Sequence, residues 1–347
     1  MDNGAKTGWA NFAHGATTVN NPHESAYDCG ACGGRRGGPN ARIFAMMANQ
    51  PAVRHRLAQM GHPIPAGTWF LAGCHDTTTD DCQFFDVEQL PETHKSLYDQ
   101  LASSCRVAGA DNALERIRRF ELASGITTPD AARRHVRERS EHLSEARPEY
   151  GHATNAVAIF GRRSLTESLY MDRRAFLISY DANTDPGCQI ITGHLGAAGL
   201  VCAGISLEYY FSTVDNEVYG CGTKLPHNIA GLVGVMNGQS GDLRTGLPKQ
   251  TVEVHEPVRV LLVIEAKPAA VEHAMSQHAE VNQIIRNEWV RIATIDPDSG
   301  IIHFYSHGAF HTYVPEPGRL PMVRNSREWY AGHMGHLPYA KLMKTLQ

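Results

Sequence analysis

The clearest hydrophobic pattern is a strand–helix–strand succession in the last third of the chain. Residues 258–264 are apolar except for Arg259, which predicts a buried strand. A helical pattern follows near residues 268–286, and residues 289–295 are again rich in β-forming side chains. Because a β-α-β order favours two parallel strands in one sheet, we predict an α/β fold with a mostly parallel central sheet flanked by helices.

Shorter patterns extend this prediction to other parts of the chain. Residues 156–160 and 175–180 read as strands, and residues 68–73 read as a buried strand that ends in a polar loop. Small residues over 196–211 predict a helix packed in the core. We expect residues 301–313 to form a terminal strand or hairpin.

The N-terminal region has a weaker pattern. We expect residues 1–12 to be an irregular start and residues 14–38 to be a glycine-rich loop. A helical pattern begins after Pro39, and Pro51 is expected to start a new helical segment or a kink. The apolar positions that recur at helical spacing are Ile43, Met46, Met47, Val53 and Leu57.

Residues 88–145 predict successive helices on which Arg and Glu alternate. Mixed charge of this kind is typical of a solvated, ion-paired helix surface, and a docking surface for a partner is the alternative. Leu114, Ile117 and Phe120 give one apolar face in this region.

Composition narrows the class of protein. The chain has 347 residues, of which 42% are hydrophobic and 20% charged, as in ordinary globular proteins. Its net charge of −4 gives no reason to expect nucleic acid. Eight cysteines without a pairing pattern, and no signal peptide, favour a reducing cytosol. The most apolar run, residues 195–211, contains Glu208 and several glycines, so we expect any membrane association to be peripheral.

The loop that begins at His14 carries the candidate chemistry. It combines His and Cys with many glycines, which let backbone approach a ligand closely, and such donors indicate a metal, zinc first. One pair of donors is Cys29 and Cys32, which could be half of a structural zinc site or a redox dithiol. The other pair is His14 with Cys29. Buried thiols and a hydrogen-bonded imidazole without metal explain the same residues equally well.

A second polar segment follows the predicted strand at residues 68–73. Polar loops after strand ends are where α/β sheets bind ligands, so His75, Asp76 and Asp80 are candidate supporting groups of a site. The alternative is a hydroxyl-rich turn, since Thr77, Thr78 and Thr79 come next.

Several of these segments together resemble one known family. His14, followed by NNPHESAYDCGACGG at residues 20–34, closely resembles the DabA family, the zinc-bearing subunit of a bacterial energy-coupled inorganic carbon pump. The zinc region of that family is similar to β-carbonic anhydrases. Further matching segments lie at residues 75–80, 219–228, 242–248 and 254–259. The resemblance covers nearly all of this chain but only the C-terminal part of the family, so we expect one C-terminal region in three parts: residues 14–87 around the zinc-site loop, a helical insertion at 88–147, and an α/β part at 148–347.

The resemblance implies half of a zinc site in this chain. Four ligands hold zinc in the family, and His14 and Cys29 match two of them, while Cys32 matches none. The other two belong to an upstream Cys-x-Asp-x-Arg motif, which this chain lacks. An N-terminal half carrying that motif is therefore an expected partner. The candidates for supporting the zinc or binding an anion such as bicarbonate are Asp28, Arg35, Arg36, His75 and Asp76.

The resemblance also implies a function. Zinc chemistry like that of carbonic anhydrase would hydrate CO₂, and a DabB-like integral membrane subunit that conducts cations would be the partner. The implied location is the cytoplasmic face of the bacterial inner membrane, as a peripheral protein. The alternatives are a truncated or split, non-catalytic fragment that needs an upstream half in trans, and a free cytosolic enzyme similar to carbonic anhydrase.

Overall fold

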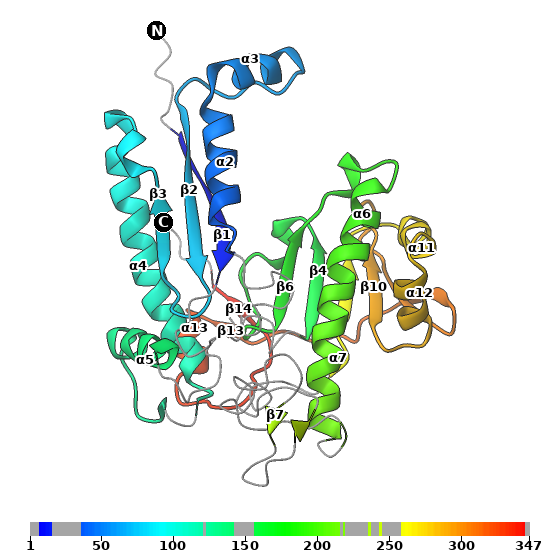
Figure 1. Ribbon diagram of the computed structural model, residues 1–347. Coiled ribbons are helices and arrows are strands. Elements are labelled where there is room, and N and C mark those ends of the chain that lie inside the picture. The colour runs from blue at the N-terminus through cyan, green and yellow to red at the C-terminus, as the bar shows by residue number, and fades with distance from the viewer. Residues whose placement is uncertain are drawn as a thin grey trace. The chain divides into compact units, whose positions relative to one another are not determined.

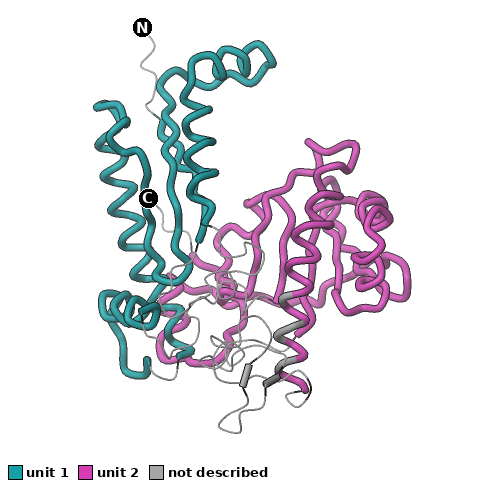
Figure 2. The backbone as a smooth tube through the Cα atoms, viewed as in Figure 1, with its two compact units in different colours: residues 1–150, 227–232 teal, residues 151–226, 233–347 magenta. Residues whose placement is uncertain are grey.

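The chain divides into two compact units. Unit 1 comprises residues 1–150 and 227–232, and unit 2 comprises residues 151–226 and 233–347 (Figure 2). The computed structural model describes residues 7–15, 36–120, 123–141, 156–215, 218, 235–236, 243–244 and 258–343.

Unit 1 is built on a three-stranded sheet in the order β1-β2-β3. The strand predicted at residues 68–73 is confirmed as β2 (Thr68–Asp76). β3 (Cys82–Phe85) pairs with it in antiparallel fashion, and β1 (Thr7–Gly15) pairs with its other edge in parallel fashion. The prediction of an irregular start was wrong, because residues 7–12 belong to β1. The segment has two glycines and no Val or Ile, so its strand conformation depends on continuous pairing with β2.

Helices lie on both sides of this sheet (Figure 1). The helical pattern after Pro39 is confirmed as α2 (Gly38–Asn49), and Pro51 starts α3 (Pro51–Gln59) as predicted. On the opposite face, the ring of Tyr98 in α4 (Lys95–Ile117) packs edge-on against Phe84 of β3. α5 (Pro129–Glu141) follows α4 and packs against it, so the helices predicted within residues 88–145 are confirmed.

The apolar positions that recur in the sequence of α2 do not form its buried face. The side chains buried against the sheet are Ala41, Ala45 and Ala48, whereas Met46 and Met47 are 57% and 48% exposed. Short alanine side chains let the helix lie close to the sheet, and the longer side chains are left on the outside. The residues packed in this small core are Ala13, Ala41, Ala45, Phe70, Ala72 and Phe85.

Unit 2 contains a six-stranded sheet in the order β12-β11-β10-β9-β4-β6. Its first four strands along the chain, which pair in parallel, are β4 (Val157–Gly161), β6 (Ala175–Ser179), β9 (Leu261–Ile264) and β10 (Arg291–Ile295). The antiparallel hairpin of β11 (Ile302–Ser306) and β12 (Ala309–Tyr313) completes it. The predicted strands, the hairpin and the mostly parallel α/β fold are therefore confirmed. The closer likeness to β-carbonic anhydrases stays a prediction.

The helices of unit 2 bury the apolar side of this sheet. The helix predicted at residues 196–211 is confirmed within a longer one made of α6 (Gln189–His194), a π-helical turn η6 (Leu195–Gly199) and α7 (Leu200–Val214). The helix predicted at residues 268–286 is instead two helices, α11 (Pro268–Ser276) and α12 (Ala279–Arg286). The break falls at His278, whose backbone is extended and whose Nε2 lies 2.9 Å from the carbonyl oxygen of Thr192.

Smaller elements complete the description. They are the 3₁₀ turns η1 (Val87–Gln89), η2 (Glu92–His94), η4 (Arg163–Thr166) and η5 (Ala182–Thr184), the helix α13 (Ser326–Tyr330), and the short strands β5 (Leu169–Tyr170), β7 (Val235–Met236), β8 (Leu243–Arg244), β13 (Met322–Val323) and β14 (Ala340–Leu342). Of the matched segments at 219–228, 242–248 and 254–259, only residues 243–244 and 258–259 are described.

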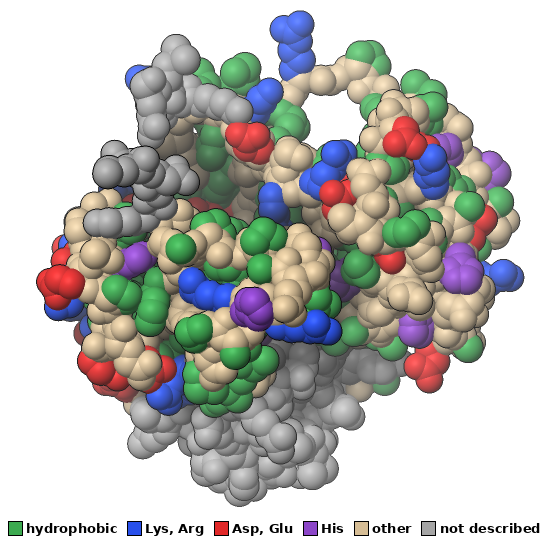
Figure 3. Space-filling view, turned by 90° about the horizontal axis from the view of Figure 1, so that it is seen from above, with side chains coloured by type: hydrophobic (Ala, Val, Ile, Leu, Met, Phe, Trp, Pro, Cys, Tyr) green, Lys and Arg blue, Asp and Glu red, His purple; other side chains and the backbone are tan. Residues whose placement is uncertain are grey.

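The apolar character of the helices and the distribution of surface charge bear on function. Among the helices that the structure describes, none combines the length and the apolar character needed to cross a bilayer. On the face shown in Figure 3, basic side chains are interspersed with acidic and hydrophobic ones instead of forming one continuous patch.

Candidate functional site

The candidate site lies where β1 and β2 end side by side. In their parallel register, His14 is opposite His75 and Gly15 is opposite Asp76. The backbone N–H of Thr77 and its hydroxyl both donate to the carbonyl oxygen of Gly15, at 2.8 and 3.2 Å. The two predicted polar segments thus meet at the carboxyl edge of one parallel strand pair, which is where α/β sheets commonly bind ligands.

The chain returns to this point before α2 begins. The N–H of Gly37 donates to the carbonyl oxygen of His14 at 2.9 Å. A Cβ atom on Gly15 would lie 2.7 Å from Cγ of Arg36, so glycine is needed for this close approach. The structure therefore places Arg36 beside Gly15, at the point where the chain runs into α2.

The other candidates in the loop fall outside the described residues. Asp28, Cys29, Cys32 and Arg35 belong to residues 16–35, which separate Gly15 from Arg36 in the chain. Their assignment as zinc ligand or supporting groups stays a prediction.

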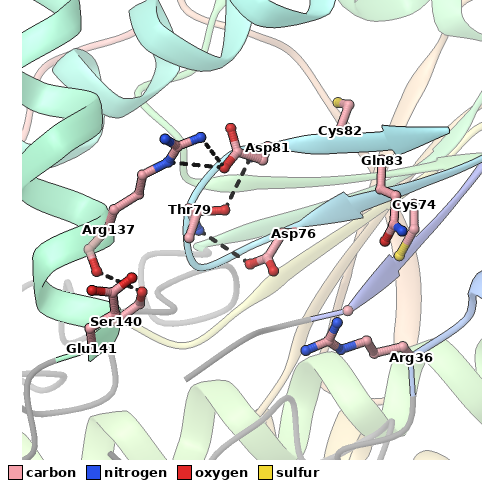
Figure 4. A pocket seen from close by; sticks show the side chains of 11 residues that line it. Arg36, Cys74, Asp76, Thr79, Asp81, Cys82, Gln83, Arg137, Ser140 and Glu141 are labelled. Atoms are coloured by element: carbon pink, nitrogen blue, oxygen red, sulfur yellow. Dashed lines mark hydrogen bonds and ion pairs between the residues drawn. The ribbon is translucent and has the colours of Figure 1, made fainter. Parts of the chain in front are cut away.

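A pocket of about 440 Å³ opens beside these strand ends (Figure 4). Gly15, Arg36 and Asp76 line it together with side chains of β2, β3 and α5. The remaining lining residues are Cys74, Thr79, Asp81, Cys82, Gln83, Arg137, Ser140 and Glu141. Arginines and carboxylates share its wall, so a polar or charged ligand is favoured over an apolar one.

The turn between β2 and β3 is held by its own polar groups. The Oδ1 atom of Asp76 accepts hydrogen bonds from the backbone N–H groups of Thr78 and Thr79, at 2.9 and 3.2 Å. Asp80 has φ of +62°, a conformation that Asp tolerates better than most residues. Asp76 therefore has a structural role in a hydroxyl-rich turn, and it also lines the pocket.

A buried ion pair with a residue of α4 holds the turn between β2 and β3 in place. The guanidinium of Arg116 lies 3.1 Å from Oδ2 of Asp80 and donates to the carbonyl oxygens of Thr77 and Thr78, each at 2.6 Å. Both charged side chains are at most 3% exposed. Asn112, one turn earlier on α4, donates to Oδ1 of Asp80 at 2.6 Å. The backbone of residues 77–80, next to the pocket, is thus held by side chains of α4 as well as by the hydrogen bonds of the turn itself.

Asp81 lies in the pocket wall and is held by two arginines of α5. Arg133 contacts its Oδ1 at 2.6 Å, and Arg137 contacts its Oδ2 at 2.8 Å. Burial opposes ionisation, but the hydrogen bonds from both guanidinium groups outweigh it and lower the pKa of Asp81. The carboxylate therefore stays ionised at neutral pH.

The two cysteines of the pocket have the opposite tendency. Burial raises the pKa of Cys74, and the charge of Asp76 adds to the effect. Burial, followed by the neighbouring Cys105, raises the pKa of Cys82 to about 11. Both thiols are therefore protonated at neutral pH, and neither is an activated nucleophile.

The donor set within the described residues is incomplete for a metal. No group of three or more His, Cys, Asp or Glu side chains in that part of the chain is arranged to hold a metal ion. Zinc needs at least three protein donors in a catalytic site. Of the two predicted ligands, His14 lies within the described residues, and the zinc site stays a prediction.

Sequence reasoning missed Asp81, Cys82 and the arginines of α5 as pocket residues. Arg133 and Arg137 are spaced i, i+4, so they lie on one helix face, which was the available signal. Nothing in the sequence indicated that this face is directed at Asp81.

Unit 2 has a second set of polar groups at strand ends. The next strand along the chain, β6, lies on one side of β4 in the sheet, and the later strand β9 lies on its other side. The order in which strands are added to the sheet therefore reverses at β4. Glu265, which follows β9 and is 2% exposed, accepts hydrogen bonds from the backbone N–H of Arg162 at 2.8 Å and from its Nε at 2.9 Å. An ion pair between Arg162 and the buried carboxylate of Glu265 thus lies where such sheets often bind ligands.

Comparison with known proteins identifies the family. A family model described as "Probable inorganic carbon transporter subunit DabA" matches residues 10–290. This chain belongs to the DabA family. A DabA 2 protein of Sorangium cellulosum is 49% identical over 334 residues, which is 96% of this chain and 33% of the relative. A DabA 1 protein of the same organism is 51% identical over 95% of this chain, and a DabA protein of Dechloromonas aromatica is 49% identical over 92%.

These DabA relatives are about three times as long as the region they share with this chain. The chain covers 32–33% of each of the three proteins just named. Their printed names describe a probable subunit of an inorganic carbon transporter. No solved structure matches the chain.

Proposed function

We propose that this chain is the part of an inorganic carbon transporter subunit that contributes His14 and Cys29 to a zinc site at the carboxyl ends of β1 and β2. Membership of the DabA family carries the transport role. The location of His14 supports the zinc site, since it directly precedes Gly15, the last residue of a parallel strand, which lines a polar pocket.

The residues present suit zinc better than a hard cation. An imidazole and a thiolate are preferred zinc donors, and His14 lies at the strand terminus to which the segment containing Cys29 is joined. Bound zinc would supply hydroxide near neutral pH for the hydration of CO₂. The remaining donors are expected from a Cys-x-Asp-x-Arg motif in a polypeptide outside this chain.

Of the described side chains, one would attract the bicarbonate anion and others would hold the pocket wall in place. Arg36 lines the pocket and approaches Gly15, so its positive charge would favour bicarbonate there. Asp76 and the network of Asp80 with Arg116 hold the turn that forms the opposite wall. His75, whose Nε2 lies 3.6 Å from Oδ1 of Asp80, would help to orient the zinc ligands at the carboxyl ends of β1 and β2.

A transporter subunit of this kind requires a membrane partner. We propose a DabB-like integral membrane subunit that conducts cations, with this protein bound peripherally at the cytoplasmic face of the inner membrane. Coupling of CO₂ hydration to cation flux would then occur at their interface.

Zinc content tests the ligand assignment. This chain would be purified alone and after co-expression with the region of the Sorangium DabA 2 protein that it does not match, and zinc per chain would be measured by elemental analysis. We expect little zinc in the chain alone and about one equivalent in the co-expressed form, because two donors bind zinc weakly.

Three variants provide the controls. His14→Ala and Cys29→Ser should each abolish zinc binding in the co-expressed form, whereas Cys32→Ser should retain it. Full occupancy in the chain alone, or loss of zinc on changing Cys32 only, would show that the ligands are assigned wrongly. Inorganic carbon uptake by cells that depend on the transporter tests Arg36→Ala, which should lower uptake without lowering zinc content.

A further inference from the structure

The outer edge of β1 is open over most of its length. β1 lies at the edge of its sheet, and no other strand of the described residues pairs with it. Thr7 donates to the carbonyl oxygen of Gly67, and Gly15 accepts from Thr77, so odd-numbered residues bond to β2. The backbone groups of Gly8, Ala10 and Phe12 therefore point away from β2.

Within the described residues 7–15, the strand itself lacks the features that usually keep an edge strand from pairing. Such strands are usually short, or carry lysine, proline or a bulge that prevents pairing with another strand. β1 has nine residues, with no charged residue and no proline, and its register with β2 is unbroken. Trp9 is 62% exposed on it. A strand with these properties is typical of the interior of a sheet.

Apolar surface continues on both faces of the sheet beside this edge. On one face, a pocket of about 310 Å³ is lined by Trp69, Leu71, Leu97 and Leu101 and by the start of β1. On the other face lies α2, whose outward apolar side chains are Ile43, Phe44, Met46 and Met47, each roughly half exposed. Exposed apolar surface of this extent around an unpaired edge indicates an interaction site.

The length of the relatives identifies the occupant. Two-thirds of each DabA relative lies outside the region that this chain matches. Parallel strand pairs such as β1 and β2 occur almost only in sheets whose faces are covered by other elements of the protein. A second copy of this chain could pair with β1 only through its own β1. The rest of a full-length DabA protein, by contrast, can supply both a new strand and apolar side chains that cover α2.

We propose that the outer edge of β1 is an interaction surface for a β-strand from the part of a full-length DabA protein that lies outside this chain. The added strand bonds to the backbone of Gly8, Ala10 and Phe12 and packs against Trp9. Apolar side chains that follow it cover the outer face of α2. The inference depends on family membership and on the open edge, and not on whether zinc is bound.

Co-purification and amide exchange test the proposal. The whole chain would be co-expressed with the non-matching region of the Sorangium DabA 2 protein and purified through a tag on one of them. We expect a one-to-one complex in which exchange at the amides of Gly8, Ala10 and Phe12 slows by roughly tenfold or more relative to the chain alone. Trp9→Lys should weaken the complex by about tenfold or more, because exposed Trp is a common anchor of interfaces.

Matched variants separate pairing from folding. Ile301→Lys changes a 47% exposed side chain of unit 2 and should leave the complex intact. Zinc content would be measured in parallel, and loss of zinc in His14→Ala with the complex retained would separate this proposal from the zinc site. A complex with unchanged exchange at the three amides, or an equally stable complex with Trp9→Lys, would overturn the proposal. So would a dimer of the chain alone that Trp9→Lys dissociates, since the occupant would then be a second copy.

Discussion

Replacement of Arg116 by Met should strongly destabilise unit 1. Arg116 is 4% exposed, and its guanidinium bonds to two backbone carbonyls and to the buried carboxylate of Asp80. Methionine keeps most of the apolar stem but removes the charge. Loss of one partner of a buried pair costs about 3–5 kcal/mol, because the other charge is left uncompensated.

The hydrogen bonds to Thr77 and Thr78 do not simply add to this value. A hydrogen bond from a charged donor contributes about 1.5–3 kcal/mol when measured alone, but contacts of one side chain are coupled. We therefore expect Arg116→Met to lower the free energy of unfolding of unit 1 by about 4 kcal/mol. The double variant Arg116→Met with Asp80→Asn should recover part of the loss, because the buried negative charge is also gone.

Urea denaturation is the assay, with amide exchange of the residue 77–81 turn reporting on unit 1 specifically. Arg42→Met is the matched control, because Arg42 also pairs with an aspartate, Asp86, but through both of its oxygens and on an exposed surface. A surface pair is screened by water and salt, so this variant should change stability little. If Arg116→Met is no more destabilising than Arg42→Met, the ion pair does not hold the turn and the reasoning is refuted.

Three further predictions follow from the same region. The pKa of Asp81 is lowered in the folded state, so its contribution to stability is present above the ordinary pKa of an aspartate and is lost as pH falls through the lowered value. Asp81→Asn should therefore lower the free energy of unfolding at pH 7. It should also flatten the decline of that free energy below about pH 5, as measured by urea unfolding across pH. The raised pKa of Cys82, about 11, should make its alkylation by iodoacetamide at pH 8 roughly a hundredfold slower than in the urea-unfolded chain, as followed by mass spectrometry. A faster reaction would show that the thiol is not shielded. A Cβ atom on Gly109 would lie 2.5 Å from the carbonyl oxygen of Asp80, so Gly109→Ala should cost about 1–3 kcal/mol, whereas Gly204→Ala, which meets nothing within 4 Å, should be close to neutral in thermal unfolding.

The sequence predicted the elements whose own residues determine their conformation. Residues 258–264 and 289–295 have long apolar runs, and the structure contains β9 and β10 there. Pro51 and Pro268 each begin a helix, because proline fits the first helical turn. Such features depend on neighbouring residues in the chain and can be identified before any partner strand is known.

The features that were missed depend on residues distant in the chain. β1 has a weak strand signal, and it forms because β2, more than fifty residues later, pairs with every position from Thr7 to Gly15. The buried face of α2 is made of alanines that lie close to the sheet, whereas the larger apolar side chains of its sequence pattern are exposed, and only the packed sheet shows this. The arginines that hold Asp81 approach it from α5, a separation of more than fifty residues. His75 and Asp76 were predicted at the end of a strand, because a polar segment after an apolar run is visible in the sequence, and they are the last two residues of β2. Their role in a site stays a prediction.

The order of strands in unit 2 has a consequence for synthesis on the ribosome. β4 pairs with β9 at the centre of the sheet, and Val157 is opposite Leu261, so the two strands are separated by about a hundred residues. A nascent chain that has already produced β4 and β6 must keep the inner edge of β4 free of other partners until β9 emerges, several seconds later at typical rates of elongation. The carboxylate that secures Arg162 arrives with the same late segment, since Glu265 directly follows β9. We therefore expect production of unit 2 to be sensitive to chaperones that shield strand edges, more than its final stability would indicate.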